Sequence, residues 1–364
     1  MKTSQLDAVD RQLLHALQVS PRASFRLLGD VIGVSDQTVG RRYRRLTQVI
    51  DLRVHGAVNG QRAGWVDWLV RIQAAPGSGE RIATALARRS DTRWVRLFSG
   101  GAEINCTLQA RTPDQPTALF LRGLPGSRHV TNVTAHSILH VFSPVEYGAY
   151  TGALSDIQVA ALREEAASET GSSAEPAAGP GRGSLASEAP AERESDVPLL
   201  RPEDEPLLTA LSRDGRAAVS ELAAATHWHE STVRRRIAEL QRAGVLYFDI
   251  DVDDYLVLGV RSHVMMWLIA EPAHLDAAGR ALALLPEVPF AAATTGPTNL
   301  VASGVFRDPA ELYAFLTARL TGIPGLRSVE TAPVIGTVKR AGEREVVPGI
   351  RRDGDLLPAA LVTG

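Results

Sequence analysis

The sequence predicts an α+β protein in which one two-part unit occurs twice. Each unit begins with a helix-turn-helix domain of the winged-helix kind and continues with a ferredoxin-like βαββαβ domain. Two observations carry this prediction: an internal duplication, and a change in each half from helical to strand-like periodicity. Residues 6–49 align without a gap with residues 200–243, and roughly a third of the aligned positions are identical.

Length and composition are those of a multidomain globular protein. The chain has 364 residues, of which 45% are hydrophobic and 22% charged. No stretch approaches the roughly eighteen apolar residues that a membrane span needs, and residues 1–9 lack the pattern of a signal peptide. The single cysteine, Cys106, excludes an intramolecular disulfide and is expected to be a buried structural thiol. We therefore expect a cytoplasmic protein without a membrane partner.

The segment between the two units differs in composition from both. Residues 155–198 are rich in Gly, Pro, Ser, Ala and Glu, and carry nine acidic and three basic side chains. This indicates a flexible acidic linker that follows a short helix at 155–167. The predicted boundaries are residues 1–55 and 199–248 for the helix-turn-helix domains, 61–145 and 255–340 for the βαββαβ domains, 151–198 for the linker, and 341–364 for a C-terminal tail.

Apolar residues at helical spacing define three short helices at the start of each unit. In the first copy they are Val9, Leu13 and Leu17, then Phe25, Leu28 and Ile32, then Val39, Tyr43 and Leu46; in the second they are Leu207 and Leu211, then Val219, Leu222 and Ala225, then Val233, Ile237 and Leu240. Gly33 is expected to end the second helix, and Ser35 to cap the third. Three short helices with a tight turn before the last are typical of a helix-turn-helix.

The rest of each unit alternates strands and helices in βαββαβ order. The expected strands are 66–73, 93–98, 104–109 and 130–141, with helices at 79–89 and 115–122; in the second copy they are 263–270, 290–294, 300–306 and 329–339, with helices at 275–285 and 310–320. One face of such a sheet stays apolar and must be covered. The other copy's sheet is the natural cover, and we expect self-association through these domains.

The third helix of each copy presents side chains suited to DNA. The candidate DNA contacts are Ser35, Gln37, Thr38, Arg41, Arg42, Arg44 and Arg45 in the first copy, and His229, Ser231, Thr232, Arg234, Arg235 and Arg236 in the second. Residues near the start of a recognition helix reach base edges; Arg pairs with guanine and Gln with adenine. Arginines farther along would meet phosphates. The predicted partner is double-stranded DNA.

The two copies differ in charge. Residues 1–55 carry nine basic and five acidic side chains, whereas residues 200–246 carry seven of each. The first copy also has Gly40 inside its third helix, which costs about 1 kcal/mol relative to Ala. We expect that one copy is the weaker reader, or that the two read different half-sites.

Taken together, the motifs resemble the Lrp/AsnC (feast/famine) transcriptional regulators. The residues that carry the resemblance are Asp7-Ala-Val-Asp10-Arg-Gln-Leu-Leu14, Gly33-Val-Ser35 and Arg41-Arg42-Tyr-Arg-Arg-Leu46 in the first half, and Val219-Ser-Glu-Leu222-Ala, Ser231-Thr-Val-Arg-Arg-Arg236-Ile-Ala-Glu-Leu240 and Ala243-Gly-Val-Leu246 in the second. The resemblance covers nearly everything except the linker and the tail, and it implies a tandem, fused member of the family.

The resemblance implies that the βαββαβ domains bind a small effector, often an amino acid, where two such domains meet. The family's site surrounds the loop between the second and third strands, which often reads Gly-x-x-Asp. The corresponding residues here are Gly100, Gly101 and Glu103 in the first copy, and Gly296, Thr298 and Asn299 in the second. Glu103 keeps the charge at greater length, and Asn299 keeps the shape without the charge, so the loops depart from the family's amino-acid site.

Two other functions remain open at this stage. Siroheme decarboxylases are built from the same two-part unit, and residues 53–59 faintly resemble a stretch that they carry; His55 and His263 would then contact a tetrapyrrole, although Gly60 replaces the histidine of their Asn-His pair. Alternatively, the chain is a ligand-binding module whose helix-turn-helix domains have degenerated, as the neutral second copy suggests.

No motif indicates an enzyme, a cofactor or a metal site. Nucleotide-binding loops, hydrolase elbows and zinc-protease motifs are absent from the sequence. His227 and His229 form a poor zinc signature without further ligands nearby. We therefore expect a regulator that is not an enzyme and that needs no cofactor.

Overall fold

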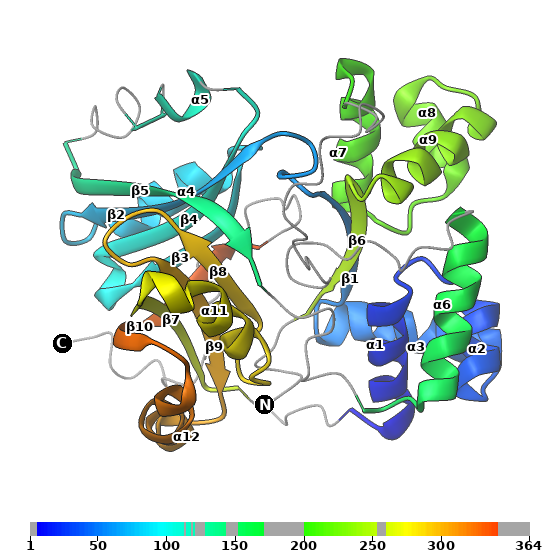
Figure 1. Ribbon diagram of the computed structural model, residues 1–364. Coiled ribbons are helices and arrows are strands. Elements are labelled where there is room, and N and C mark those ends of the chain that lie inside the picture. Colours follow the sequence, from blue (N-terminus) through cyan, green and yellow to red (C-terminus); the bar gives the residue numbers. More distant parts are fainter. Residues whose placement is uncertain are drawn as a thin grey trace, which may run out of the picture. The chain divides into compact units, whose positions relative to one another are not determined.

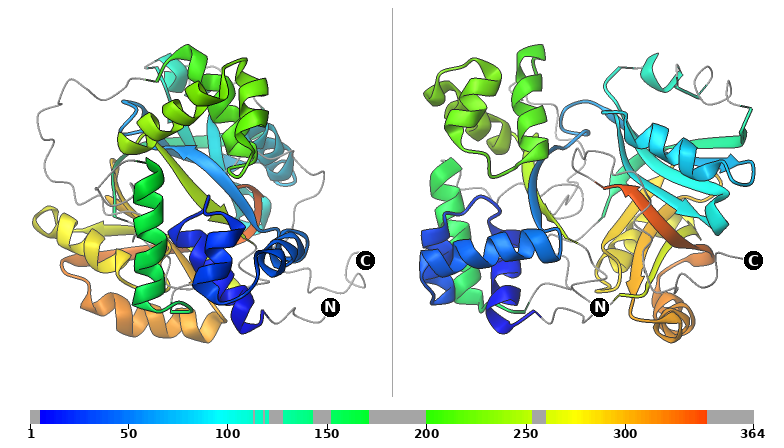
Figure 2. Two further views of the ribbon diagram at one scale, coloured as in Figure 1. Left: turned by 90° about the vertical axis from the view of Figure 1, so that its right-hand side faces the viewer. Right: turned by 180° about the vertical axis from the view of Figure 1, so that it is seen from behind.

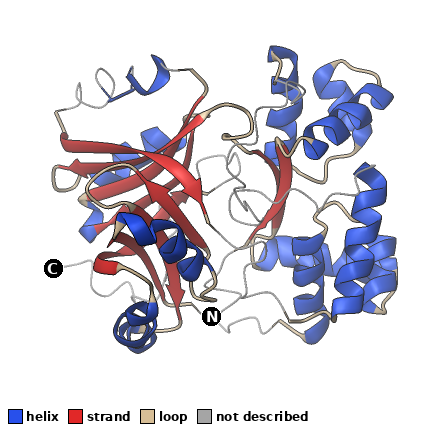
Figure 3. Cartoon of the chain, in the orientation of Figure 1, coloured by secondary structure: helices blue, strands red, loops and turns tan. Residues whose placement is uncertain are grey.

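The computed structural model describes residues 6–112, 114–117, 119–120, 128–142, 152–170, 200–252 and 260–340. The chain forms two compact structural units, which are not the two repeats of the sequence. Residues 1–63 with 142–257 form the first structural unit, and residues 64–141 with 258–364 form the second. The first unit contains both helix-turn-helix domains and is mainly helical, whereas the second contains both βαββαβ domains (Figures 1 and 3). Within the described ranges, no helix is long and apolar enough to cross a bilayer.

The predicted helices of the first unit are present in both copies. They are α1 (Ala8–Val19), α2 (Phe25–Ile32) and α3 (Asp36–Val49), and then α7 (Glu205–Arg213), α8 (Val219–Thr226) and α9 (Glu230–Arg242), with a 3-10 turn at Pro202–Asp204 before α7. Ser35 caps α3 as predicted, since its hydroxyl accepts a hydrogen bond from the Thr38 N–H. Gly33 ends α2 in the left-handed region at φ 83°. His227 holds the equivalent position after α8 at φ 57°.

A strand follows each helix-turn-helix, and the sequence analysis did not predict either one. β1 (Arg53–Val58) pairs antiparallel with β6 (Leu246–Asp251), and Val58 lies opposite Leu246. Figure 2 shows the two strands side by side, in blue and yellow-green. Each strand completes a two-stranded sheet only with the other half of the chain, so the pairing joins the two helix-turn-helix domains.

A helix lies at the start of the segment between the two copies, as the sequence predicts. α6 spans Asp156–Thr170, and it packs near α1, α2 and α9. Gln158 donates a hydrogen bond to the Val31 carbonyl at 2.6 Å, and the Leu154 N–H donates to His15 Nδ1 at 3.1 Å. The short helix expected at 155–167 is therefore present, and it extends to Thr170. Residues 171–199 and the tail at 341–364 lie outside the described residues.

The second unit has the predicted βαββαβ order in both copies. The first copy contains β2 (Val66–Ala74), α4 (Gly79–Ala87), β3 (Thr92–Phe98), a 3-10 turn at Ser99–Gly101, β4 (Glu103–Ala110), α5 (Asp114–Thr117) and β5 (Val130–Val141). The second contains β7 (Ser262–Ala270), a 3-10 turn at Pro272–His274, α11 (Leu275–Ala283), β8 (Phe290–Thr294), β9 (Leu300–Phe306), α12 (Pro309–Ala314), a π turn at Phe315–Arg319, a 3-10 turn at Leu320–Gly322 and β10 (Leu326–Lys339).

The eight strands of this unit form one closed sheet, in the order β10-β3-β4-β2-β5-β8-β9-β7. The two copies join at β5–β8 and at β10–β3, so each edge strand of one copy pairs with the other copy. The expectation that each sheet covers the other is therefore confirmed, with the additional feature that their edges are joined. Edge strands left unpaired would be open to aggregation.

The outer face of the first sheet packs under α4. Val70, Ile72, Cys106 and Leu108 of the strands form a buried cluster with Leu86 of the helix. Cys106 is fully buried, and burial raises the pKa of its thiol to about 12. The prediction of a structural, unreactive cysteine fits this environment.

Candidate nucleic-acid interface and effector loops

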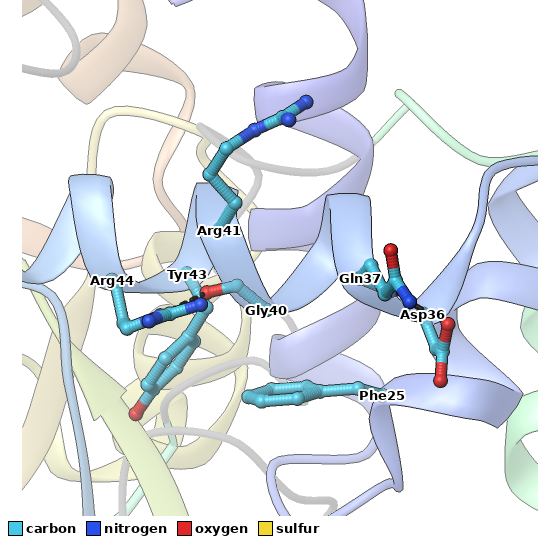
Figure 4. A pocket seen from close by; sticks show the side chains of 7 residues that line it. All are labelled: Phe25, Asp36, Gln37, Gly40, Arg41, Tyr43 and Arg44. Carbon is cyan, nitrogen blue, oxygen red and sulfur yellow. Dashed lines mark hydrogen bonds between the residues drawn. The ribbon is translucent and has the colours of Figure 1, made fainter.

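Exposed polar side chains lie along one side of α3. A pocket beside this helix is lined by Phe25, Asp36, Gln37, Gly40, Arg41, Tyr43 and Arg44. Figure 4 shows Arg41 extending from α3 away from the rings of Phe25 and Tyr43. Gln37, Arg41 and Arg44 are all exposed. A Cβ on Gly40 would make an ordinary contact with the Phe25 ring, at 3.4 Å.

Two of the predicted DNA contacts, Arg42 and Arg236, form ion pairs within the protein. Arg236 is 5% exposed and donates two hydrogen bonds to Asp204, at 2.8 and 2.6 Å. Arg42, at the equivalent place in the first copy, donates to Asp7 at 2.6 Å and to Asp10 at 2.8 Å. These carboxylates raise the pKa of both arginines. Both guanidinium groups tie the third helix of their copy to the start of the first; Arg236 is buried, whereas the Arg42 side chain keeps 23% of its surface exposed.

The remaining predicted residues of α3 divide between capping and exposure. Ser35 Oγ and Thr38 Oγ1 lie 2.9 Å apart and are engaged in the helix cap. Arg45 also bonds to Asp10. Arg44 Nε donates to the Gly40 carbonyl at 3.2 Å. Among the residues that the structure describes, neither Arg41 nor Arg44 has a carboxylate partner.

The α9 helix of the second copy pairs its arginines with its own carboxylates. Arg234 lies 2.7 Å from Glu230, and Arg235 lies 3.7 Å from Glu239. Ser231 and both of these arginines are exposed. His229 caps the helix, since its Nδ1 accepts a hydrogen bond from the Ser231 N–H at 3.3 Å. The histidine therefore has the capping role that Ser35 has in the first copy. Thr232 is half-buried.

A reciprocal pair of arginines fixes the two helix-turn-helix domains relative to each other. Arg22 donates to the carbonyl of Gly215, and Arg216 donates to the carbonyls of Pro21 and Ala23, at 2.6 and 2.7 Å. Each guanidinium also stacks on an aromatic ring of the other half, Arg22 on Phe248 and Arg216 on Phe25. Arg22 and Arg216 hold equivalent positions in the duplicated sequence, but nothing in the sequence indicates that each bonds to the other copy.

The first effector loop is closed by an ion pair that was not predicted. Gly100 and Gly101 turn the chain at φ 66° and 85°, which favours glycine. Glu103 follows them, and its buried carboxylate accepts bonds from the Arg71 guanidinium. Arg71 also bonds to Glu330 of the second copy and stacks on Trp267 at 4.2 Å. Burial lowers the pKa of Arg71, but the two carboxylates outweigh this effect and hold it above its ordinary value.

The second effector loop is held mainly by the backbone at the end of β7. Asn299 accepts a hydrogen bond from the Ala270 N–H at 2.9 Å and donates to the Ala270 carbonyl at 2.8 Å. Thr298 contributes its carbonyl, which accepts from Thr294. Gly296 lies against the His136 ring, and a Cβ there would stand 2.3 Å from His136 Nδ1. The predicted loop residues are thus brought beside Arg71 and His136, neither of which sequence analysis singled out.

His55 and His263, considered above for tetrapyrrole binding, are packed against other residues of the protein. Among the described residues, no group of three or more His, Cys, Asp or Glu side chains could hold a metal ion. His263 lies 2.7 Å from the Ser303 hydroxyl. Burial and the charges of Arg96 and Arg340 hold the pKa of His263 well below its ordinary value. His55 is buried within β1.

Comparison with known proteins agrees with both parts of the unit. The AsnC-type helix-turn-helix domain matches residues 6–47 and 204–241, and the Lrp/AsnC ligand binding domain matches residues 263–343. An uncharacterized HTH-type transcriptional regulator of Pyrococcus abyssi is 32% identical over 143 residues, which is 39% of this chain and 90% of that protein. Another, from Pyrococcus horikoshii, is 29% identical over the same length, again 39% of this chain and 90% of that protein.

A whole-chain likeness comes from a solved structure. The siroheme decarboxylase NirDL, in complex with an iron-uroporphyrin III analogue, matches 94% of this chain and 95% of its own, with a TM-score of 0.58. Sequence identity is 11%, so the likeness shows the fold: a tandem arrangement of the same two-part unit.

Proposed function

The chain belongs to the Lrp/AsnC family, and from this premise we propose that it is a sequence-specific DNA-binding transcriptional regulator. The observation that carries the proposal is the α3 helix, which presents Gln37 and Arg41 to solvent at the position from which a recognition helix reads base edges. A second helix-turn-helix is held in the same unit by β1, β6 and the reciprocal arginines. One chain then supplies the pair of reading heads that DNA-binding proteins usually obtain by dimerisation.

We further propose that the βαββαβ domains bind a small, amino-acid-like effector at the loops near Glu103 and Asn299. The proposal rests on the match to the Lrp/AsnC ligand binding domain. The Glu103 carboxylate is already engaged by Arg71. An effector with an ammonium group would therefore compete with Arg71 for this carboxylate, which favours a ligand that makes additional contacts.

Fluorescence anisotropy tests the DNA-binding proposal. The purified chain is titrated on labelled DNA from upstream of its own gene, at two salt concentrations, with unrelated DNA as competitor. Binding that weakens steeply with salt and survives the competitor would support a regulator, because phosphate contacts release counterions. Binding with no preference over the competitor would count against it.

A second candidate is a decarboxylase that acts on a tetrapyrrole, and its support is the whole-chain fold likeness to NirDL. The absorption spectrum of the purified protein, before and after addition of siroheme, separates the two candidates. Tight binding of siroheme with a shifted visible band would favour the enzyme. An unshifted spectrum, together with specific DNA binding, would favour the transcriptional regulator over the enzyme.

A further inference from the structure

We propose that the chain reads an asymmetric DNA site, in which α3 recognises one half-site strongly and α9 recognises a weaker, less specific half-site. This inference rests on the proposed DNA-binding function. It differs from the arrangement expected of two identical heads, which would read a palindrome.

The first step is the chemistry at equivalent positions of the two helices. Gln37 of α3 corresponds to Ser231 of α9, and Arg44 corresponds to Ala238. Arg45 corresponds to Glu239, so one position changes from a cation to an anion. Along the exposed face, α9 therefore lacks the cation of Arg44 and carries a carboxylate in place of Arg45, while it gains one cation, Arg234, where α3 has Gly40.

The second step is the pairing of the arginines that remain. Arg234 and Arg235 lie beside Glu230 and Glu239 on the same helix. The Glu239 carboxylate also accepts a hydrogen bond from Arg236 at 3.1 Å, so it stays in place when exposed Arg235 moves away. Ion pairs of exposed arginines such as Arg234 and Arg235 are weak and can open. The two carboxylates nevertheless stay on the helix and would repel phosphates wherever the arginines move. Binding DNA through α9 therefore requires two cations to act against two anions held close to them.

The first copy lacks this opposition. Among the described residues, Arg41 and Arg44 have no carboxylate partner. Asp36 corresponds to Glu230, but its carboxylate accepts a hydrogen bond from the Gln37 N–H at 2.7 Å and pairs with no described arginine. Gly40 stands where α9 has Arg234, so no cation is drawn towards Asp36.

The third step concerns base discrimination. Gln and Arg each form paired hydrogen bonds with one base, adenine and guanine respectively, whereas serine contacts several bases. Gln37 and Arg41 thus both specify bases of their half-site, whereas the second copy keeps the arginine, as Arg235, but has Ser231 in place of the glutamine, so its half-site is less well defined. Since Arg22 and Arg216 hold the heads together, both half-sites lie at one fixed spacing.

Selection of binding sites from a pool of random DNA duplexes by the full-length chain tests the arrangement. We expect an enriched site with one well-defined half and one poorly defined half. Enrichment of a palindrome with equally defined halves would overturn the inference and leave the proposed function intact. Failure to enrich any sequence would instead overturn the DNA-binding function itself.

Matched variants at equivalent positions then assign the halves. On the selected duplex, Arg41→Ala should weaken binding about 10- to 100-fold, the range expected for loss of a paired base contact. Arg235→Ala should weaken binding by less than about threefold. Arg280→Ala, which removes an exposed arginine of the other unit, should leave binding unchanged and serves as the control. Equal losses for Arg41→Ala and Arg235→Ala would contradict the inference.

Removal of the opposing carboxylates supplies a gain-of-function arm. Glu230→Gln together with Glu239→Gln should tighten binding several-fold and make the slope of log K against log salt steeper by about one. The equivalent change in the first copy, Asp36→Asn, should have a smaller effect, because only one carboxylate is removed. Unchanged affinity in the double variant would show that the carboxylates of Glu230 and Glu239 do not weaken DNA binding by α9, and would overturn the inference.

Discussion

Equivalent residues of the two copies have diverged in chemistry and now contact each other. Arg71 of β2 and Trp267 of β7 hold the same position in the two sheets, and the guanidinium lies 4.2 Å from the centre of the indole ring. A homodimer would place two identical side chains at this point. Fusion of the copies permits a cation and an aromatic ring there, together with the link from Arg71 to Glu330.

At the residue scale, His263 should make the second unit sensitive to acid. Its pKa is depressed in the folded chain, so below about pH 6.5 the unfolded chain binds a proton that the folded chain excludes. Its contribution is thus lost as pH falls from about 7 to 5, by up to about 1.4 kcal/mol per pH unit.

Urea unfolding followed by tryptophan fluorescence measures this effect, because Trp65, Trp68, Trp94 and Trp267 all lie in the second unit. His263→Gln keeps a partner for Ser303 without titrating, so its free energy of unfolding should vary less with pH. Parallel curves for the two proteins would refute the assignment.

A second residue-scale prediction concerns the buried pair of Arg236 and Asp204. Arg236→Met leaves the Asp204 carboxylate buried without its cation, which typically costs about 3–5 kcal/mol. The neighbouring exposed Arg235→Met is the matched control and should change stability by less than about 0.5 kcal/mol. Hydrogen exchange at the α9 amides checks both. Equal protection in the two variants would mean that Arg236 is not structural.

At the element scale, local sequence patterns were sufficient where an element is stabilised by its own neighbours. Gly33 ends α2 and Ser35 caps the start of α3, both through contacts within a few residues, and both roles were predicted. β1 and β6 were missed because each pairs with a strand nearly two hundred residues away in the chain. The turn of α12 into a π segment at Phe315 was missed for a similar reason, since Phe315 packs against Phe306 of β9.

The candidate site was predictable in its residue types but not in its pairing. The arginine-rich third helix follows from apolar periodicity, which identifies the outward positions. Which arginine is free depends on Asp10 and Asp204, which lie 32 residues before Arg42 and Arg236. The engagement of Glu103 by Arg71 depends on strand register, which the sequence alone does not determine.

The packing of β1 against the second copy gives a prediction at this scale. A Cβ on Gly215 would stand 2.9 Å from three backbone atoms of His55. Gly215→Ala should therefore destabilise the first unit by about 1–3 kcal/mol. Gly322→Ala is the control, because its Cβ would meet nothing within 4 Å. The two melting temperatures, measured by circular dichroism, decide the matter, and equal values would show that the close approach is relieved.

At the scale of the whole molecule, duplication accounts for both units. One contains two helix-turn-helix domains joined by β1 and β6, and the other contains two sheets joined at both edges. Each joint uses parts of both copies, so neither half of the chain completes its own structure. Covalent fusion guarantees the pairing and lets each half change independently, as α3 and α9 have done.

The most direct test of the central claim is the association constant of the full chain for its selected duplex, measured across salt concentrations. Wild-type protein is compared with the charge reversal Arg41→Glu with Arg44→Glu. We predict that wild-type affinity falls steeply with salt, and that the variant loses both the preference over competitor DNA and about one to two units of the slope. Identical salt curves for the two proteins would contradict the claim that α3 reads DNA.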